Sequence, residues 1–166
     1  MRAKRALATI ICSVALFGGA GPAGAEAPAG SDQAVTLSPD VLDLLRQEMR
    51  EISGAVQRIP LALAAGDWKV IEDTSAAIRA SYILEKALTP SQARELEHSL
   101  PERFKHLDAE FHHRAGELEL AARAHDYEVA AFHYSRLLET CARCHSEYAG
   151  SRFPGLAPPA REEHQH

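Results

Sequence analysis

Apolar side chains recur at spacings of three and four residues along most of residues 38–148, and this spacing places them on one face of an α-helix. The periodicity is clear in the segments that begin near residues 38, 101 and 127, and it is weakest in residues 68–88. No strand pattern, hairpin dipeptide or phosphate-binding glycine loop interrupts it. The sequence therefore predicts an all-α fold, an antiparallel four-helix bundle. The predicted buried faces comprise Val41, Leu45, Met49, Ile52, Val56 and Ile59; Ile71, Ile78 and Tyr82; Phe104, Leu107, Phe111, Ala115, Leu118 and Ala122; and Ala130, Tyr134, Leu137, Cys141, Cys144 and Tyr148.

Short local signals mark the ends of these helices. Ser38, Pro39 and Asp40 supply an N-cap, a proline at the first helical position and an acid in the first turn. Pro60 is expected to kink the first helix near its end. The first two helices are predicted to be separated by a turn at residues 65–67, and the last two by a turn at residues 125–126. The second helix is predicted to end at residues 89–90 and the third to start at residue 101, with a short helical turn in residues 91–100 between them.

The two predicted turns between long helices have similar sequences. Gly66-Asp67-Trp68-Lys69-Val70 and His125-Asp126-Tyr127-Glu128-Val129 each place an aspartate just before the next helix. This similarity suggests two related helical hairpins.

The N-terminus has the features of a secretory signal peptide. Residues 1–25 contain an early run of basic residues and an apolar stretch to about residue 20, and they end in Ala23-Gly24-Ala25, a small-residue cleavage signature. The apolar stretch is shorter than the roughly 18 to 20 residues of a spanning helix, and no later segment is apolar enough to cross a bilayer. We expect export to the periplasm, a flexible leader at residues 26–37, one helical domain at 38–150 and a C-terminal tail at 151–166.

The exported chain is acidic. Cleavage removes three of the 18 basic residues and none of the 23 acidic ones, so the formal net charge changes from −5 to −8. A chain this acidic is a poor partner for nucleic acids. The sequence has no nucleophile beside a base, no paired acids on one helix face and no substrate motif, so we expect no enzymatic activity.

Cys141-Ala142-Arg143-Cys144-His145 is a C-x-x-C-H sequence, the attachment signature of c-type haem. Residues three apart share a helix face, so Cys141 and Cys144 can both bond one edge of a porphyrin while His145 binds the iron. The alternatives are a disulfide, half of a zinc site and a thioredoxin-like redox pair. Zinc requires a second close pair of ligands and a thioredoxin motif lies beside a strand, and the sequence predicts neither. We therefore expect one covalent haem c with its iron.

Because this motif lies near the end of the last of four helices and Tyr148 follows it, the chain resembles the class II cytochromes c, the cytochrome c-prime group, over about residues 38–153. Class I cytochromes c carry the motif early and a methionine ligand well downstream, whereas no methionine follows His145. The resemblance implies a periplasmic mono-haem electron carrier that works with redox partner proteins. It also allows a homodimer, because class II members frequently pair through their first two helices.

The sixth iron ligand separates the candidate functions. Met49 is the only methionine after residue 25; it lies 17 residues before Gly66, and His145 lies 19 residues after Asp126. At about 1.5 Å per residue the two would lie within roughly 3 Å of each other along an antiparallel bundle, so Met49 is the predicted distal ligand. Methionine with histidine raises the reduction potential and suits electron transfer. If Met49 only fills the core, the resemblance implies a five-coordinate protein that binds nitric oxide or carbon monoxide. A haem-free helical adaptor or metal-binding protein is the third alternative.

Further side chains are expected near the haem. The histidines other than His145 are expected at the surface or on the motif-bearing helix, and none of them is a predicted ligand. The resemblance implies that Arg46, one turn from Met49, contacts a haem propionate, with an exposed surface arginine as the alternative. The expected wall of the haem comprises Ile83, Phe104, Leu107, Phe111 and Tyr148.

Overall fold

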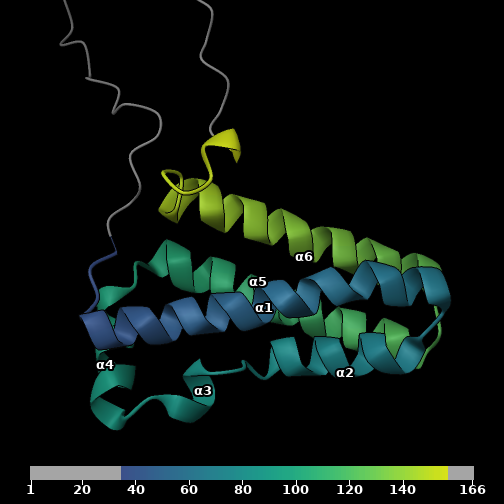
Figure 1. The fold of residues 1–166 in the computed structure, drawn as a ribbon, viewed down its shortest axis with the longest axis horizontal. Helices are drawn as coiled ribbons and strands as arrows, with labels where there is room; N and C mark the ends of the chain where they lie inside the picture. The colour runs from purple at the N-terminus through teal and green to yellow at the C-terminus, as the bar shows by residue number, and fades with distance from the viewer. Residues whose placement is uncertain (1–34, 157–166) are drawn as a thin grey trace, which may run out of the picture.

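Residues 35–156 are described in a computed structural model of the chain (Figure 1). The predicted signal peptide, most of the leader and the tail beyond residue 156 lie outside these residues. The described elements are α1 (Pro39–Ala65), α2 (Trp68–Arg79), α3 (Leu84–Ala87), α4 (Pro90–Ser99), α5 (Glu102–Arg123), α6 (Tyr127–Tyr148) and the 3-10 turn η1 (Pro154–Leu156). The predicted all-α class is confirmed. Among these helices none is long and apolar enough to cross a membrane.

The long helices pack as two antiparallel hairpins, α1 with α2 and α5 with α6. α2 lies along α5 and joins the hairpins, and the α2–α5 and α5–α6 contacts are the most extensive of the described part. α1 and α6 contact each other over a short stretch only, and in Figure 1 they diverge toward the end where α6 finishes. α3 and α4 connect α2 to α5 and contact α1. The largest buried apolar side chains of the core between the long helices include Ile52, Ile59, Ile71, Ile78, Phe111, Leu118 and Leu137.

The two hairpin turns have the same construction, as their sequences suggested. Gly66 and His125 both have positive φ angles, of 67° and 54°. In each turn the next residue, Asp67 or Asp126, accepts a hydrogen bond from the backbone N–H three residues on, at 3.2 and 3.1 Å. The rings of Trp68 and His125 stack with centroids 5.2 Å apart and planes 9° apart. This stack fastens one turn to the other.

Pro60 lies inside α1 and does not end it. Because proline has no N–H, the carbonyl four residues earlier, that of Val56, loses its helical partner. The hydroxyl of Tyr134 in α6 donates a hydrogen bond to this carbonyl at 3.3 Å. The contact between α1 and α6 therefore uses a backbone group that the proline has freed.

The predicted second helix, residues 68–88, is wrong in its second half. α2 ends at Arg79, Ser81 has a positive φ of 54°, and the next helix, α3, has only four residues. The cause lies on α1, where the buried carboxylate of Glu48 accepts hydrogen bonds from the N–H groups of residues 82–84. These N–H groups cannot also continue the helix, so the helix breaks.

α4 is longer than the short helical turn predicted for residues 91–100, because it spans ten residues. Thr89 and Gln92 form a capping box at its start. Its Glu95 carboxylate accepts hydrogen bonds from the backbone N–H and, at 3.0 Å, from the hydroxyl of Ser38. α4 therefore holds the N-terminal end of α1.

Candidate functional site

Cys141 and Cys144 lie near the C-terminal end of α6, three residues apart and so on one face of the helix. Both are half-buried free thiols with no disulfide between them. Burial raises the pKa of each thiol to about 11. Redox-active cysteines have lowered pKa values, so this environment does not favour a thioredoxin-like pair. Within residues 35–156, moreover, no three His, Cys, Asp or Glu side chains gather into a metal site.

Two ion pairs hold this end of α6 against α5. Arg143, which lies inside the motif, pairs with Glu110 at 3.0 Å, and Arg103 pairs with Glu147 at 3.0 Å. The face of α6 that carries the cysteines therefore has a fixed orientation relative to α5.

The imidazole of His145 lies flat against the ring of Phe153, with centroids 4.2 Å apart and planes 3° apart. Burial and, secondly, the charge of Arg152 lower the pKa of His145. The ring is therefore neutral near pH 7, and neither ring nitrogen makes a hydrogen bond within the described residues. A neutral imidazole with a free nitrogen is the form that binds a metal.

A residue count from the hydrogen bond between Tyr134 and Val56 compares the heights of Met49 and Cys141 along α1 and α6. Met49 lies seven residues before Val56, and Cys141 lies seven residues after Tyr134, the pair through which the helices are hydrogen-bonded. Seven residues make nearly two full turns, so Met49 lies on the same side of α1 as Val56, and Cys141 lies on the same side of α6 as Tyr134. Because the helices are antiparallel, both steps run in the same direction and reach roughly 10 Å beyond the hydrogen bond. Met49 and Cys141 thus lie at the same level.

Met49 is not buried as predicted, because its side chain is 40% exposed. The buried face of α1 runs through Val41, Glu48 and Ile52 instead. Glu48, only 2% exposed, takes the inward position since its carboxylate binds the N–H groups of residues 82–84. Met49 consequently lies beside the buried face of α1 rather than on it, and its role as an iron ligand stays a prediction.

Phe104 and Tyr148, two residues of the expected haem wall, lie against each other, and the wall itself stays a prediction. Phe104 packs edge-on against Tyr148 with 5.1 Å between ring centroids, and Phe111 is buried in the core. The hydroxyl of Tyr148 is buried and has no hydrogen-bond partner within the described residues. Arg46, in contrast, is exposed and pairs with Asp43 at 3.3 Å. Its guanidinium is therefore engaged with this carboxylate, and the contact with a haem propionate stays a prediction.

His112 is not at the surface as expected. It is half-buried; its Nδ1 lies 2.8 Å from the carbonyl oxygen of Ile78, and its Nε2 lies 3.6 Å from the carboxylate of Asp108. Asp108 raises the pKa of His112 more than burial lowers it. The side chain therefore links α5 to the end of α2. His133 of α6 has a buried, unpartnered Nδ1, and burial lowers its pKa.

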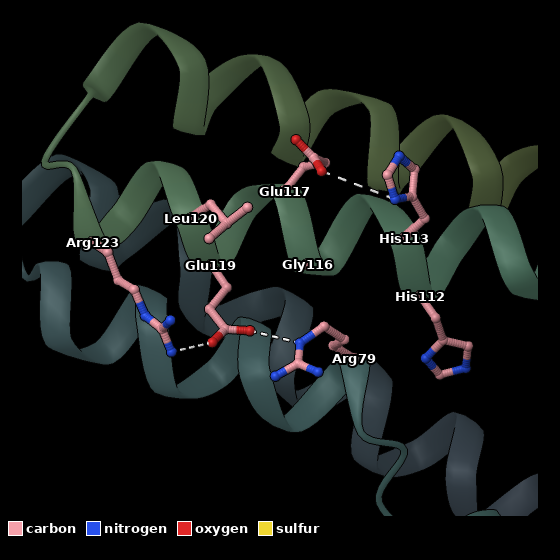
Figure 2. A pocket seen from close by; sticks show the side chains of 8 residues that line it. All are labelled: Arg79, His112, His113, Gly116, Glu117, Glu119, Leu120 and Arg123. Carbon is pink, nitrogen blue, oxygen red and sulfur yellow. Dashed lines mark hydrogen bonds and ion pairs between the residues drawn. The ribbon is translucent and has the colours of Figure 1, made fainter.

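An open hollow of about 420 Å³ lies over α2 and α5 (Figure 2). The buried carboxylate of Glu119 pairs there with Arg79 at 2.7 Å and with Arg123. Arg79 crosses α5 at Gly116, where an added Cβ would lie 3.0 Å from its Cδ. The Arg79–Glu119 pair links α2 to α5, whereas Glu119 and Arg123 both lie on α5. The lining comprises Arg79, His112, His113, Gly116, Glu117, Glu119, Leu120 and Arg123.

Sequence reasoning missed Glu48 and Phe153. Glu48 had a visible signal, since it continues the helical spacing of Val41 and Ile52 as an acid on an apolar stripe. Phe153 lies in the segment assigned to the tail, and its only signal was a large aromatic side chain close behind the motif.

Comparison with models of protein families, with curated proteins and with solved structures finds no match for this chain.

Proposed function

We propose that the chain is an exported, single-haem c-type cytochrome that carries electrons in the periplasm. Cys141 and Cys144 would hold the haem c through thioethers, and His145 and Met49 would bind its iron. One observation carries the proposal: the two free thiols of a C-x-x-C-H motif share one face near the end of α6. By residue count Met49 would lie at a similar height along α1.

The side chains around the motif suit a planar, largely apolar group. The two thiols are protonated at neutral pH and no disulfide consumes them. Phe104 and Phe111 supply apolar surface from α5, and the buried hydroxyl of Tyr148 lacks an acceptor. When bound, haem supplies a one-electron couple between ferric and ferrous iron.

The two proposed iron ligands, His145 and Met49, differ in how much their side chains must move to bind iron. His145 is neutral and its ring is held in one plane by Phe153. Met49 must turn from solvent toward α6, which its unbranched side chain can do without movement of the helix. A thioether opposite the imidazole favours reduced iron and raises the potential. Arg46 can reach a propionate only by leaving Asp43.

The exposure of Met49 supports a second candidate function. If this side chain keeps to solvent, the iron is five-coordinate and the protein binds small gases such as nitric oxide or carbon monoxide. The two candidates share the same attachment residues, so the distal side alone distinguishes them.

Location and partners belong to the same proposal. Residues 1–25 would direct export, after which a net charge of −8 suits redox partner proteins with basic surfaces, because complementary charge speeds their encounter. Pairing of two copies, which the class II resemblance allows, is not required for electron transfer.

The test is to produce the exported chain together with haem-attachment machinery and to record absorption spectra when oxidised, reduced, and reduced under carbon monoxide. For the wild type we expect covalent haem, the far-red band of methionine-bound ferric iron and no response to carbon monoxide. Met49→Ala should lose the band and bind carbon monoxide. Leu61→Ala removes another exposed side chain of α1, which is 75% exposed, and should change neither result.

Two other outcomes have distinct meanings. A high-spin wild-type spectrum that shifts at once with carbon monoxide would overturn ligation by Met49 and favour the gas-binding candidate. If the wild type carries no more covalent haem than the double variant Cys141→Ser/Cys144→Ser, both cytochrome candidates are overturned and the haem-free helical adaptor is favoured.

A further inference from the structure

Phe153 is the one aromatic side chain of the described residues that lies flat on His145. The ring centroids are 4.2 Å apart and the ring planes differ by 3°. Two rings in this arrangement exclude water from the covered face and attract each other by dispersion. The contact therefore restricts rotation of the imidazole about its Cβ–Cγ bond.

The backbone that brings Phe153 to this place is itself ordered by hydrogen bonds. The Ala149 N–H donates to the carbonyl of His145 at 3.0 Å, and the Phe153 N–H donates to the carbonyl of Ala149 at 3.0 Å. The Arg152 N–H bonds the same carbonyl of Ala149 at 2.9 Å. The chain therefore reverses directly after α6 and returns to the histidine, so residues 149–153 form a closed turn over the motif.

We propose that Phe153 is a positioning residue, which fixes the plane of the His145 imidazole and thereby the direction of the ring nitrogen that binds iron. This inference rests on the proposed function, in which His145 is the proximal ligand. It also gives a role to part of the segment predicted as a tail, since residues 151–156 then complete the proximal side of the site.

Proton NMR of the full chain tests the inference in two forms. In the oxidised, haem-bearing protein, the order and spread of the shifted haem methyl resonances report the plane of the axial imidazole. We expect Phe153→Leu to change this pattern, Phe153→Tyr to restore it, and Leu156→Ala, a substitution in the same segment, to leave it as in the wild type. In the haem-free full chain, the His145 ring protons should be shifted upfield in the wild type and in Phe153→Tyr, but not in Phe153→Leu.

The outcomes separate this inference from the function on which it rests. Identical haem methyl patterns in the wild type and Phe153→Leu, with haem attached in both, would overturn the positioning role and leave the cytochrome proposal intact. A wild type that never carries haem would overturn both, even if the haem-free spectra still show the stacked rings.

Discussion

The hydroxyl of Tyr134 compensates for the hydrogen bond that Pro60 removes from α1. In Tyr134→Phe the carbonyl of Val56 is left unpaired, and we expect the free energy of unfolding to fall by about 1 kcal/mol. In a Pro60→Ala background that carbonyl regains a helical N–H partner, so the same change should cost less. Urea denaturation of the four proteins of this double-mutant cycle measures the difference. Equal costs in both backgrounds would contradict the compensation.

Glu48 is a buried acid whose hydrogen-bond donors are backbone N–H groups of residues 82–84. An amide in its place offers one acceptor oxygen and turns an NH₂ group toward these donors. We expect Glu48→Gln to lower the free energy of unfolding by about 2 kcal/mol, because hydrogen bonds to a charged acceptor are lost. Glu51→Gln, a matched change on the exposed face of α1, should stay within about 0.5 kcal/mol in the same urea titration. A similarly small loss for Glu48→Gln would show that its carboxylate does not stabilise the break between α2 and α3.

His112 has a pKa raised above 6.5, chiefly by Asp108 and in spite of burial. Since the folded state favours the protonated ring, this stability is fully present below pH 6.5 and is lost as the pH rises through the raised pKa. We expect His112→Gln to be more destabilising at about pH 5.5 than at about pH 8.5. Chemical denaturation at both pH values measures this, with Asp108→Asn expected to remove most of the difference. If the loss of unfolding free energy in His112→Gln does not change with pH, His112 stabilises the protein through its contact with the Ile78 carbonyl alone.

At the scale of elements, Gly54 inside α1 and Gly66 directly after it should respond in opposite ways to the same substitution. Gly66 has a φ of 67° and open space around an added Cβ, so Gly66→Ala should cost about 1 kcal/mol through backbone conformation alone. Gly54 lies inside α1, and the nearest atom to an added Cβ is 3.8 Å away on Arg58. Gly54→Ala should therefore stabilise the protein by roughly 0.5 to 1 kcal/mol. Thermal denaturation that gives the same sign for both would contradict this assignment.

The elements that local residues determine were predictable from the sequence, and those that depend on distant residues were not. The four long helices could be located in the sequence from Pro39, from the two turns with an aspartate cap and from the helical spacing of apolar residues. The break after α2 depends on Glu48, which is 34 residues away from Tyr82 along the chain, and no local pattern reveals such a contact. The same carboxylate displaced Met49 from the buried face. Within the site, the spacing of the motif predicted that Cys141 and Cys144 share a face, but the stacking of Phe153 required the chain reversal after α6.

At the scale of the whole molecule, α1 and α6 contact each other little where the proposed haem would lie. Attached haem would bury apolar surface between them, so the loaded protein should melt at a higher temperature than Cys141→Ala with Cys144→Ala. A gain of 1 kcal/mol corresponds to about 4 °C, and we expect at least this much. Calorimetry measures it, with haem content determined on the same samples. Equal melting temperatures with haem attached would place the haem outside the space between the two helices.

The stack of Trp68 on His125 joins both hairpin turns at one end of the domain. The two hairpins are therefore joined at this end, whereas α1 and α6 diverge toward the end where α6 finishes (Figure 1). Local separation of α1 from α6 at that end should require less free energy than global unfolding, since it leaves the Trp68–His125 stack and the core around it intact. Such local separation would let the proposed haem reach the two thiols of a folded chain. Under the proposed attachment, two thioether bonds would retain the haem even if α1 and α6 separated again, so the separation would be reversible and the binding of haem would not.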